Sequence, residues 1–75
     1  MDKWTYYQNG ARHDFYGRDW AVLSAIKAAN VARRAVIVIE PDGTYLVVGI
    51  NGEVSECGNS FAAACDAHDA LSEAA

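Results

Sequence analysis

The sequence predicts a small, single-domain α+β protein over residues 1–75, with an antiparallel sheet and two helices in the order ββαβββα. Three turn signals and two apolar stripes of helical period support this prediction. The turn signals are Gln8–Gly10, Pro41–Gly43 and Asn51-Gly52. Hydrophobic residues make up 52% of the 75-residue chain, which is too apolar for disorder but enough for only one small core.

The N-terminal segment is predicted to form a β-hairpin. Asn9-Gly10 separates the aromatic run Trp4–Tyr7 from residues 11–16. Asn-Gly accepts the positive φ angles that a two-residue hairpin turn requires. We therefore expect two short strands ahead of the first helix.

The first helix is predicted over residues 19–33. Asp19 is a suitable cap, and Arg33 and Arg34 are expected in the last turn, where the helix dipole favours positive charge. The apolar positions recur with the period of a helix, which predicts a buried stripe. The stripe consists of Val22, Leu23, Ala25, Ile26 and Ala29.

A three-stranded meander is predicted over residues 35–40, 44–50 and 53–57. The first of these strands is apolar on both faces, so it should be central. Alternation along residues 44–50 places Leu46 on one face and Tyr45 on the other. With both helices packed on one face, Tyr45 would remain on the second. We expect the N-terminal aromatic hairpin to cover that second face.

The second helix is predicted over residues 60–73, capped by Asn59 or Ser60. Its apolar stripe consists of Phe61, Ala64, Cys65, His68 and Leu71. Three acids lie on another side at spacings of three and four, namely Asp66, Asp69 and Glu73. The sequence therefore predicts an acidic outer face on this helix.

Charge is divided unevenly along the chain. Residues 1–34 hold all six basic residues and three acids, whereas residues 35–75 hold seven acids and no base. An acidic segment of this kind repels nucleic acid and membrane surfaces and attracts basic ones. The expected partner is a protein or complex with a basic surface, with no direct nucleic acid and no membrane. No apolar run spans a bilayer, and we expect a cytoplasmic protein.

Chemically reactive residues point only weakly to a site. Cys65 and His68 lie one helical turn apart, so a metal or thiol site completed by Cys57 is an open alternative. No nucleophile motif or phosphate-binding loop is present. We therefore expect a protein that is not an enzyme, with no cofactor and no metal.

Two families share parts of this organisation. Residues 20–75 resemble the double-stranded-RNA-binding domain in topology, but "NSFAAACDAHDA" stands where that family has a run of lysines. The resemblance therefore implies a topology and not RNA binding. The segment "DGTYLVVGINGEVSECGNSFAAACDAHDALSEA" is similar to HicB-type antitoxin N-domains, where a meander precedes a Gly-capped helix. That resemblance implies an antitoxin or small regulator that binds a basic partner.

At the level of a class, the chain resembles small phage and mobile-element inhibitors, anti-CRISPR proteins among them. The shared features are a short stand-alone chain, net acidity and a compact α+β organisation without a catalytic motif. This resemblance implies an inhibitor of a host defence complex, in the cytoplasm of a bacterial host. The inhibitor would act as a nucleic-acid mimic on a basic surface.

The predicted partner-binding surface lies in the C-terminal half. No Lys or Arg lies near its acidic residues in the sequence. An aromatic neighbour would anchor the partner. The surface consists of Tyr45, Glu53, Glu56, Asp66, Asp69 and Glu73. A chain with so small a core also leaves homodimerisation open.

Overall fold

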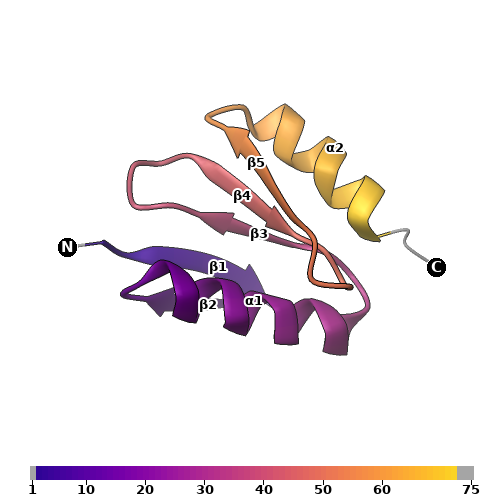
Figure 1. Cartoon of the computed structure of the whole chain (residues 1–75), viewed down its shortest axis with the longest axis horizontal. Helices are drawn as coiled ribbons and strands as arrows, with labels where there is room; N and C mark the ends of the chain where they lie inside the picture. The colour runs from indigo at the N-terminus through magenta and orange to yellow at the C-terminus, as the bar shows by residue number, and fades with distance from the viewer. Residues whose placement is uncertain (1, 73–75) are drawn as a thin grey trace.

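The computed structural model describes residues 2–72 and confirms the α+β fold and the order ββαβββα (Figure 1). The elements are β1 (Trp4–Gln8), β2 (Ala11–Phe15), α1 (Arg18–Ala32), β3 (Val36–Ile39), β4 (Tyr45–Val48), β5 (Val54–Gly58) and α2 (Phe61–Ser72). One antiparallel sheet contains all five strands in the order β2-β1-β3-β4-β5. The strand that is apolar on both faces, β3, is therefore central, as predicted.

The predicted turns form because their residues tolerate left-handed backbone. Asn9 and Gly10 have φ angles of 54° and 77°, the signs that a tight hairpin turn requires, and they join β1 to β2. The turn between β3 and β4 has Gly43 at φ 89°. It is closed by a bond from the Glu40 amide to the Thr44 carbonyl at 2.8 Å. These turns fix the register of the strands that they join.

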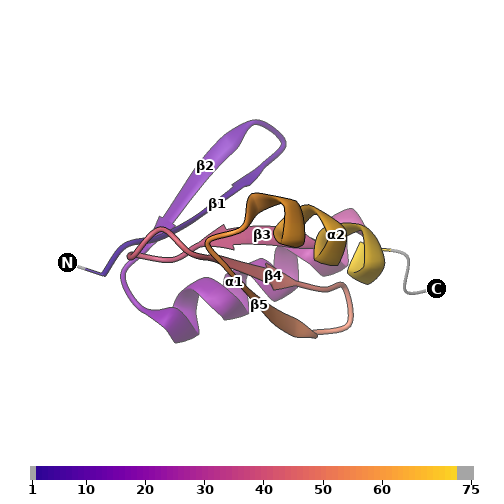
Figure 2. The ribbon, with the colours of Figure 1, turned by 90° about the horizontal axis from the view of Figure 1, so that it is seen from above.

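The two helices lie on opposite faces of the sheet, which corrects the expectation that both would share one face (Figures 1 and 2). Leu46 and Val48 point toward α1, whereas Val47 and Tyr45 belong to the cluster under α2. Because successive side chains of a strand alternate, each face of the central strands has its own helix to cover it.

The aromatic hairpin extends the sheet and does not cover the Tyr45 face as expected. Trp4 and Tyr6 are buried on the side of α1. The Tyr6 ring stacks on Phe15, with ring centroids 5.8 Å apart, and its hydroxyl lies 2.7 Å from the Ser24 hydroxyl of α1. The hydrogen bond to the helix satisfies the one polar atom of a buried tyrosine.

The hairpin diverges from the rest of the sheet. The pairing of β1 with β3 is limited to Thr5↔Ile39 and Tyr6↔Val38, although β1 continues to Gln8. Instead, the Gln8 side chain donates a hydrogen bond to the carbonyl of Ala28 in α1. Figure 2 shows the hairpin projecting away from β3. The face opposite α1 is therefore open between the hairpin and α2.

The ends of α1 differ from the sequence prediction. Gly17, not Asp19, is the N-cap residue, and Asp19 lies in the first turn. Arg33 follows the helix in a left-handed conformation, with φ 58° and ψ 38°, so neither Arg33 nor Arg34 belongs to the last turn. The backbone amide of Arg34 donates a hydrogen bond to the Ala29 carbonyl at 3.2 Å, which closes the helix end.

The buried face of α1 also differs from the predicted stripe. Its buried residues are Ala21, Ala25, Ala28 and Ala29. Val22 and Ile26 are partly buried beside them, but Leu23 is 48% exposed. Small side chains let a helix approach a sheet closely, so the alanines and not the larger residues mark the contact. Within residues 2–72, neither helix has the length and apolarity needed to cross a membrane.

Candidate functional site

The outer side of α2 presents two exposed acids, Asp66 and Asp69. Ser60 caps this helix, as one of the two predicted options, because its hydroxyl accepts a hydrogen bond from the Ala63 amide at 3.1 Å. Ala64 and Leu71 face the sheet in the α2 cluster. The helical period then directs Asp66 and Asp69 away from the sheet.

Little positive charge surrounds these two acids. The sequence of α2 has no Lys or Arg. The Asp69 Oδ1 atom lies 3.4 Å from Nδ1 of His68. Among residues 2–72, no Lys or Arg forms an ion pair with Asp66 or Asp69. Among the described residues, no Lys or Arg therefore neutralises the outer side of α2.

Glu53 and Glu56, two of the other predicted acids, have polar contacts of their own. Glu56 lies on the α1 side, where its carboxylate is 3.9 Å from the guanidinium of Arg18. Glu53 lies in the β4–β5 turn and accepts a hydrogen bond from the Asn51 amide at 3.1 Å. Glu73 lies outside the described residues. The expectation of one acidic surface is thus corrected for Glu56, which tertiary folding places on the opposite face beside a basic residue.

Glu40 and Glu56 form an acidic pair on the α1 side. Burial raises the pKa of the Glu40 carboxyl, and a hydrogen bond to Glu56 and the negative charge of Glu56 raise it further. The Oε2 atom of Glu40 is buried and has no hydrogen-bond partner among the described residues. Burial and the nearby negative charge both oppose ionisation, so the folded protein favours the neutral form of Glu40.

Tyr45 has a second aromatic residue beside it, which the sequence prediction assigned to the buried stripe. The Tyr45 ring is partly buried and meets the edge of the Phe61 ring, with centroids 5.5 Å apart. Phe61 is 58% exposed. It is the first residue of α2, where the helix begins beyond the rim of the sheet. In the sequence, the position of Phe61 directly after the capping residue Ser60 was the signal that could have indicated its exposure.

An open groove of about 560 Å³ runs beside α2, on the face that the hairpin leaves uncovered. Ile37 and Ile39 of β3 lie at its apolar base. The walls come from α2, β4, the hairpin and the α1–β3 connection. They include Tyr7, Gln8, Asn9, Arg34, Tyr45, Phe61 and His68. Among residues 2–72, no Asp or Glu lines the groove. An apolar side chain from a partner fits this chemistry, because most of the lining is apolar or aromatic.

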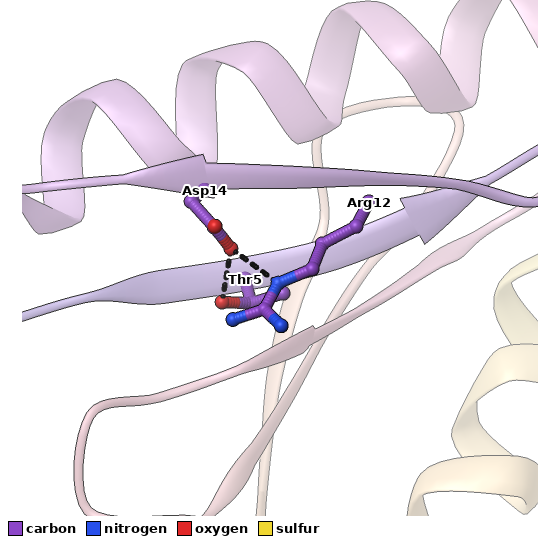
Figure 3. Close-up of polar contacts among 3 residues, drawn as sticks. All are labelled: Thr5, Arg12 and Asp14. Carbon is purple, nitrogen blue, oxygen red and sulfur yellow. Dashed lines mark hydrogen bonds and ion pairs between the residues drawn. The ribbon is translucent and has the colours of Figure 1, made fainter.

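The hairpin side of the same face carries a small polar cluster (Figure 3). The Asp14 carboxylate accepts hydrogen bonds from the Thr5 hydroxyl at 2.8 Å and from Nε of Arg12 at 2.9 Å. The bond from Arg12 and then the bond from Thr5 lower the pKa of Asp14. The two bonds to Asp14 join β1 to β2, and the ion pair balances the charge of Asp14 against that of Arg12.

The cysteine and histidine positions do not assemble a site. Cys57 and Cys65 are free thiols, each partly buried. Within residues 2–72, no group of three His, Cys, Asp or Glu side chains has the arrangement to hold a metal ion. The polar contact of His68 in the structure is with Asp69 and not with a thiol. The alternative of a metal or thiol site at Cys57, Cys65 and His68 therefore gains no geometric support.

Comparisons with protein-family models, curated proteins and solved structures find no match to this chain. Function is therefore inferred from the geometry and charge of the chain itself.

Proposed function

We propose that this chain is a non-enzymatic binding protein that occupies a basic surface of another protein or complex, one used for nucleic acid. The observation that carries the proposal is the outer side of α2, where Asp66 and Asp69 are exposed without a Lys or Arg partner among the described residues. The exposed Phe61 lies on the same helix. An inhibitor of a host defence complex, as in the small phage proteins that the chain resembles, is the role that this chemistry fits.

The α2 surface, defined as Tyr45, Phe61, Asp66 and Asp69, has the parts that a protein interface needs. Binding energy in such interfaces concentrates in a few buried aromatic anchors, while charges at the rim mainly speed association. Phe61 borders the apolar groove and can serve as the anchor. The two aspartates would attract a basic partner and keep phosphate away from the same place.

A HicB-like antitoxin or small regulator would use the same surface on a basic toxin or regulator. The identity of the partner separates the two roles, and the groove and acids are common to both. A metal or thiol protein is not favoured, because the described residues bring no metal-holding group together.

The test begins with the purified protein as bait in a bacterial lysate, followed by kinetics on the captured partner. We expect the captured partner to have a basic surface that binds nucleic acid. Added nucleic acid should compete with this chain for that surface. The double variant Asp66→Lys, Asp69→Lys should slow association about tenfold, with the effect shrinking as salt increases. Phe61→Ala should accelerate dissociation about tenfold.

A matched control changes the same amount of charge elsewhere. Asp2→Lys with Asp19→Lys reverses two exposed acids that do not lie on α2. Association should be far less sensitive to this control pair. Equal rates for the two double variants at every salt concentration, with both folds intact, would show that the α2 acids are an ordinary solvated surface.

A further inference from the structure

The outer face of α1 carries large apolar side chains that nothing in the described part of the chain covers. Trp20 is 69% exposed, Leu23 48% and Val31 81%. Lys27 lies between the last two and is exposed. Positions 20, 23, 27 and 31 recur at three and four residues, so they form one stripe along the helix.

This arrangement reverses the usual placement of residues in a surface helix. The buried positions of α1 are all alanines, with Val22 and Ile26 partly buried beside them, and the side that faces solvent carries tryptophan, leucine and valine. Single exposed apolar residues are common, but a continuous stripe marks an interaction surface. Tyr16, which is 65% exposed, lies just before the N-terminus of the helix and extends the series.

The spacing of these residues is self-complementary. A midpoint between Leu23 and Ser24 is equally far from Trp20 and Lys27 in the sequence. An antiparallel copy of the helix centred on that midpoint therefore places Trp20 of one chain beside Lys27 of the other, twice. It also places the two Leu23 side chains together at the centre.

We infer that the α1 stripe, defined as Trp20, Leu23, Lys27 and Val31, binds a second copy of this chain in an antiparallel, two-fold symmetric dimer. A contact of this kind uses the same patch on both chains, so each favourable pair occurs twice. The ammonium of Lys27 over the face of a Trp20 ring is a cation–π pair, and antiparallel helices oppose their dipoles. This inference is independent of the proposed function, because α1 and α2 lie on opposite faces of the sheet.

The dimer predicts a charge-swap rescue. Trp20→Lys should place a second ammonium beside Lys27 of the other chain and weaken the dimer about a hundredfold, since two contacts are lost at about tenfold each. Lys27→Glu added to Trp20→Lys should restore most of the affinity, because the introduced ammonium of one chain would then attract the introduced carboxylate of the other. Both positions are exposed on the helix, so the fold should tolerate the changes.

The experiment is sedimentation analysis of the purified protein over a wide range of concentration. We expect the wild-type chain to associate to a dimer, Trp20→Lys to remain monomeric at concentrations where the wild type is dimeric, and the double variant to recover. Val54→Lys, at an exposed apolar residue of β5, is the control for adding a lysine elsewhere and should still dimerise.

Fluorescence gives a second readout, because Trp4 is 8% exposed and Trp20 is 69% exposed. Dilution of the Trp4→Phe variant should shift Trp20 emission toward the red as the dimer separates. A wild-type monomer at millimolar concentration would overturn the inference, as would a dimer unaffected by Trp20→Lys. Failure of the charge swap to rescue would overturn the antiparallel register.

Discussion

At the scale of single residues, Arg33 occupies a backbone conformation that suits glycine better. Its φ of 58° and ψ of 38° lie in the left-handed region, and its position directly after α1 is the one where glycine commonly ends a helix. A side chain with a Cβ atom costs about 1–2 kcal/mol in this conformation. The chain retains this strain at the point where it turns from α1 into β3.

Arg33→Gly should therefore raise the free energy of unfolding by about 0.5–1 kcal/mol, because relief of the left-handed strain outweighs the added flexibility of the unfolded chain. Urea unfolding followed by circular dichroism measures the change. Arg34→Gly is the matched control: it removes an arginine of the same connection whose φ is not positive, so it should leave stability unchanged or lower it. Equal effects from both substitutions would mean that charge, and not backbone strain, sets the difference.

Glu40 is the second residue whose environment has a measurable consequence. Its raised pKa means that the folded protein favours the neutral carboxyl more than the unfolded chain does, first through burial and then through Glu56. The resulting stabilisation is fully present below the ordinary Glu pKa of 4.5. It is lost as the pH rises through the raised pKa of the folded state.

Glu40→Gln removes this titration while keeping the shape of the side chain. We expect the variant and the wild type to have similar stability near pH 4, and the variant to be the more stable at pH 7. The Gln amide is neutral and can donate a hydrogen bond to Glu56. Urea unfolding at a series of pH values tests this, and the titrations of Asp14 and Asp42 cancel because both proteins contain them. Curves of unfolding free energy against pH that run parallel for the two proteins would contradict the prediction. In a separate variant, Glu56→Gln should make the pH dependence from Glu40 smaller.

At the scale of elements, α1 illustrates how packing distance decides which residues are buried. Ala21, Ala25 and Ala29 have no exposed area, whereas Leu23 and Val31 on the same helix face solvent. A helix whose contact face is alanine can approach the sheet closely and leaves no space for longer side chains. Hydrophobicity alone predicts the opposite orientation for Leu23.

Ala25→Leu should lower the free energy of unfolding by about 1–3 kcal/mol, because the added carbons must displace α1 from the sheet. The same substitution at Ala62, an exposed residue of α2, provides the control and should change stability by less than about 0.5 kcal/mol. Chemical denaturation of both variants measures the difference. A neutral Ala25→Leu would mean that space exists beneath α1.

At the scale of the whole molecule, the five-stranded sheet separates two faces of different composition. The α1 side contains the larger core and the acidic pair of Glu40 and Glu56. The α2 side contains a smaller cluster, the open groove and the exposed acids Asp66 and Asp69. A dimer through α1 would leave both copies of the α2 surface accessible, so a partner with two basic sites could be bound twice.

The sequence by itself determined the elements and the central strand, because these depend on local chemistry. Asn9-Gly10 and Gly43 occupy the positions where the backbone needs positive φ, and Ser60 caps the helix that follows it. The alternation of Leu46 and Val47 already divided the strand between two faces. The acids of α2 were likewise predictable, since helical spacing alone places Asp66 and Asp69 on one side.

Only the tertiary structure decided which face each helix covers, because the connections of these strands permit a helix on either side of the sheet. With the helices on opposite faces, Glu56 lies on the α1 side, next to Arg18, and is separated from the acids of α2. This arrangement also left the hairpin free to diverge and to open the groove beside Phe61. Leu23 and Trp20 are exposed because α1 turns its alanines toward the sheet. That rotation of the helix depends on contacts with many residues of the sheet, and no local pattern in the helix encodes it.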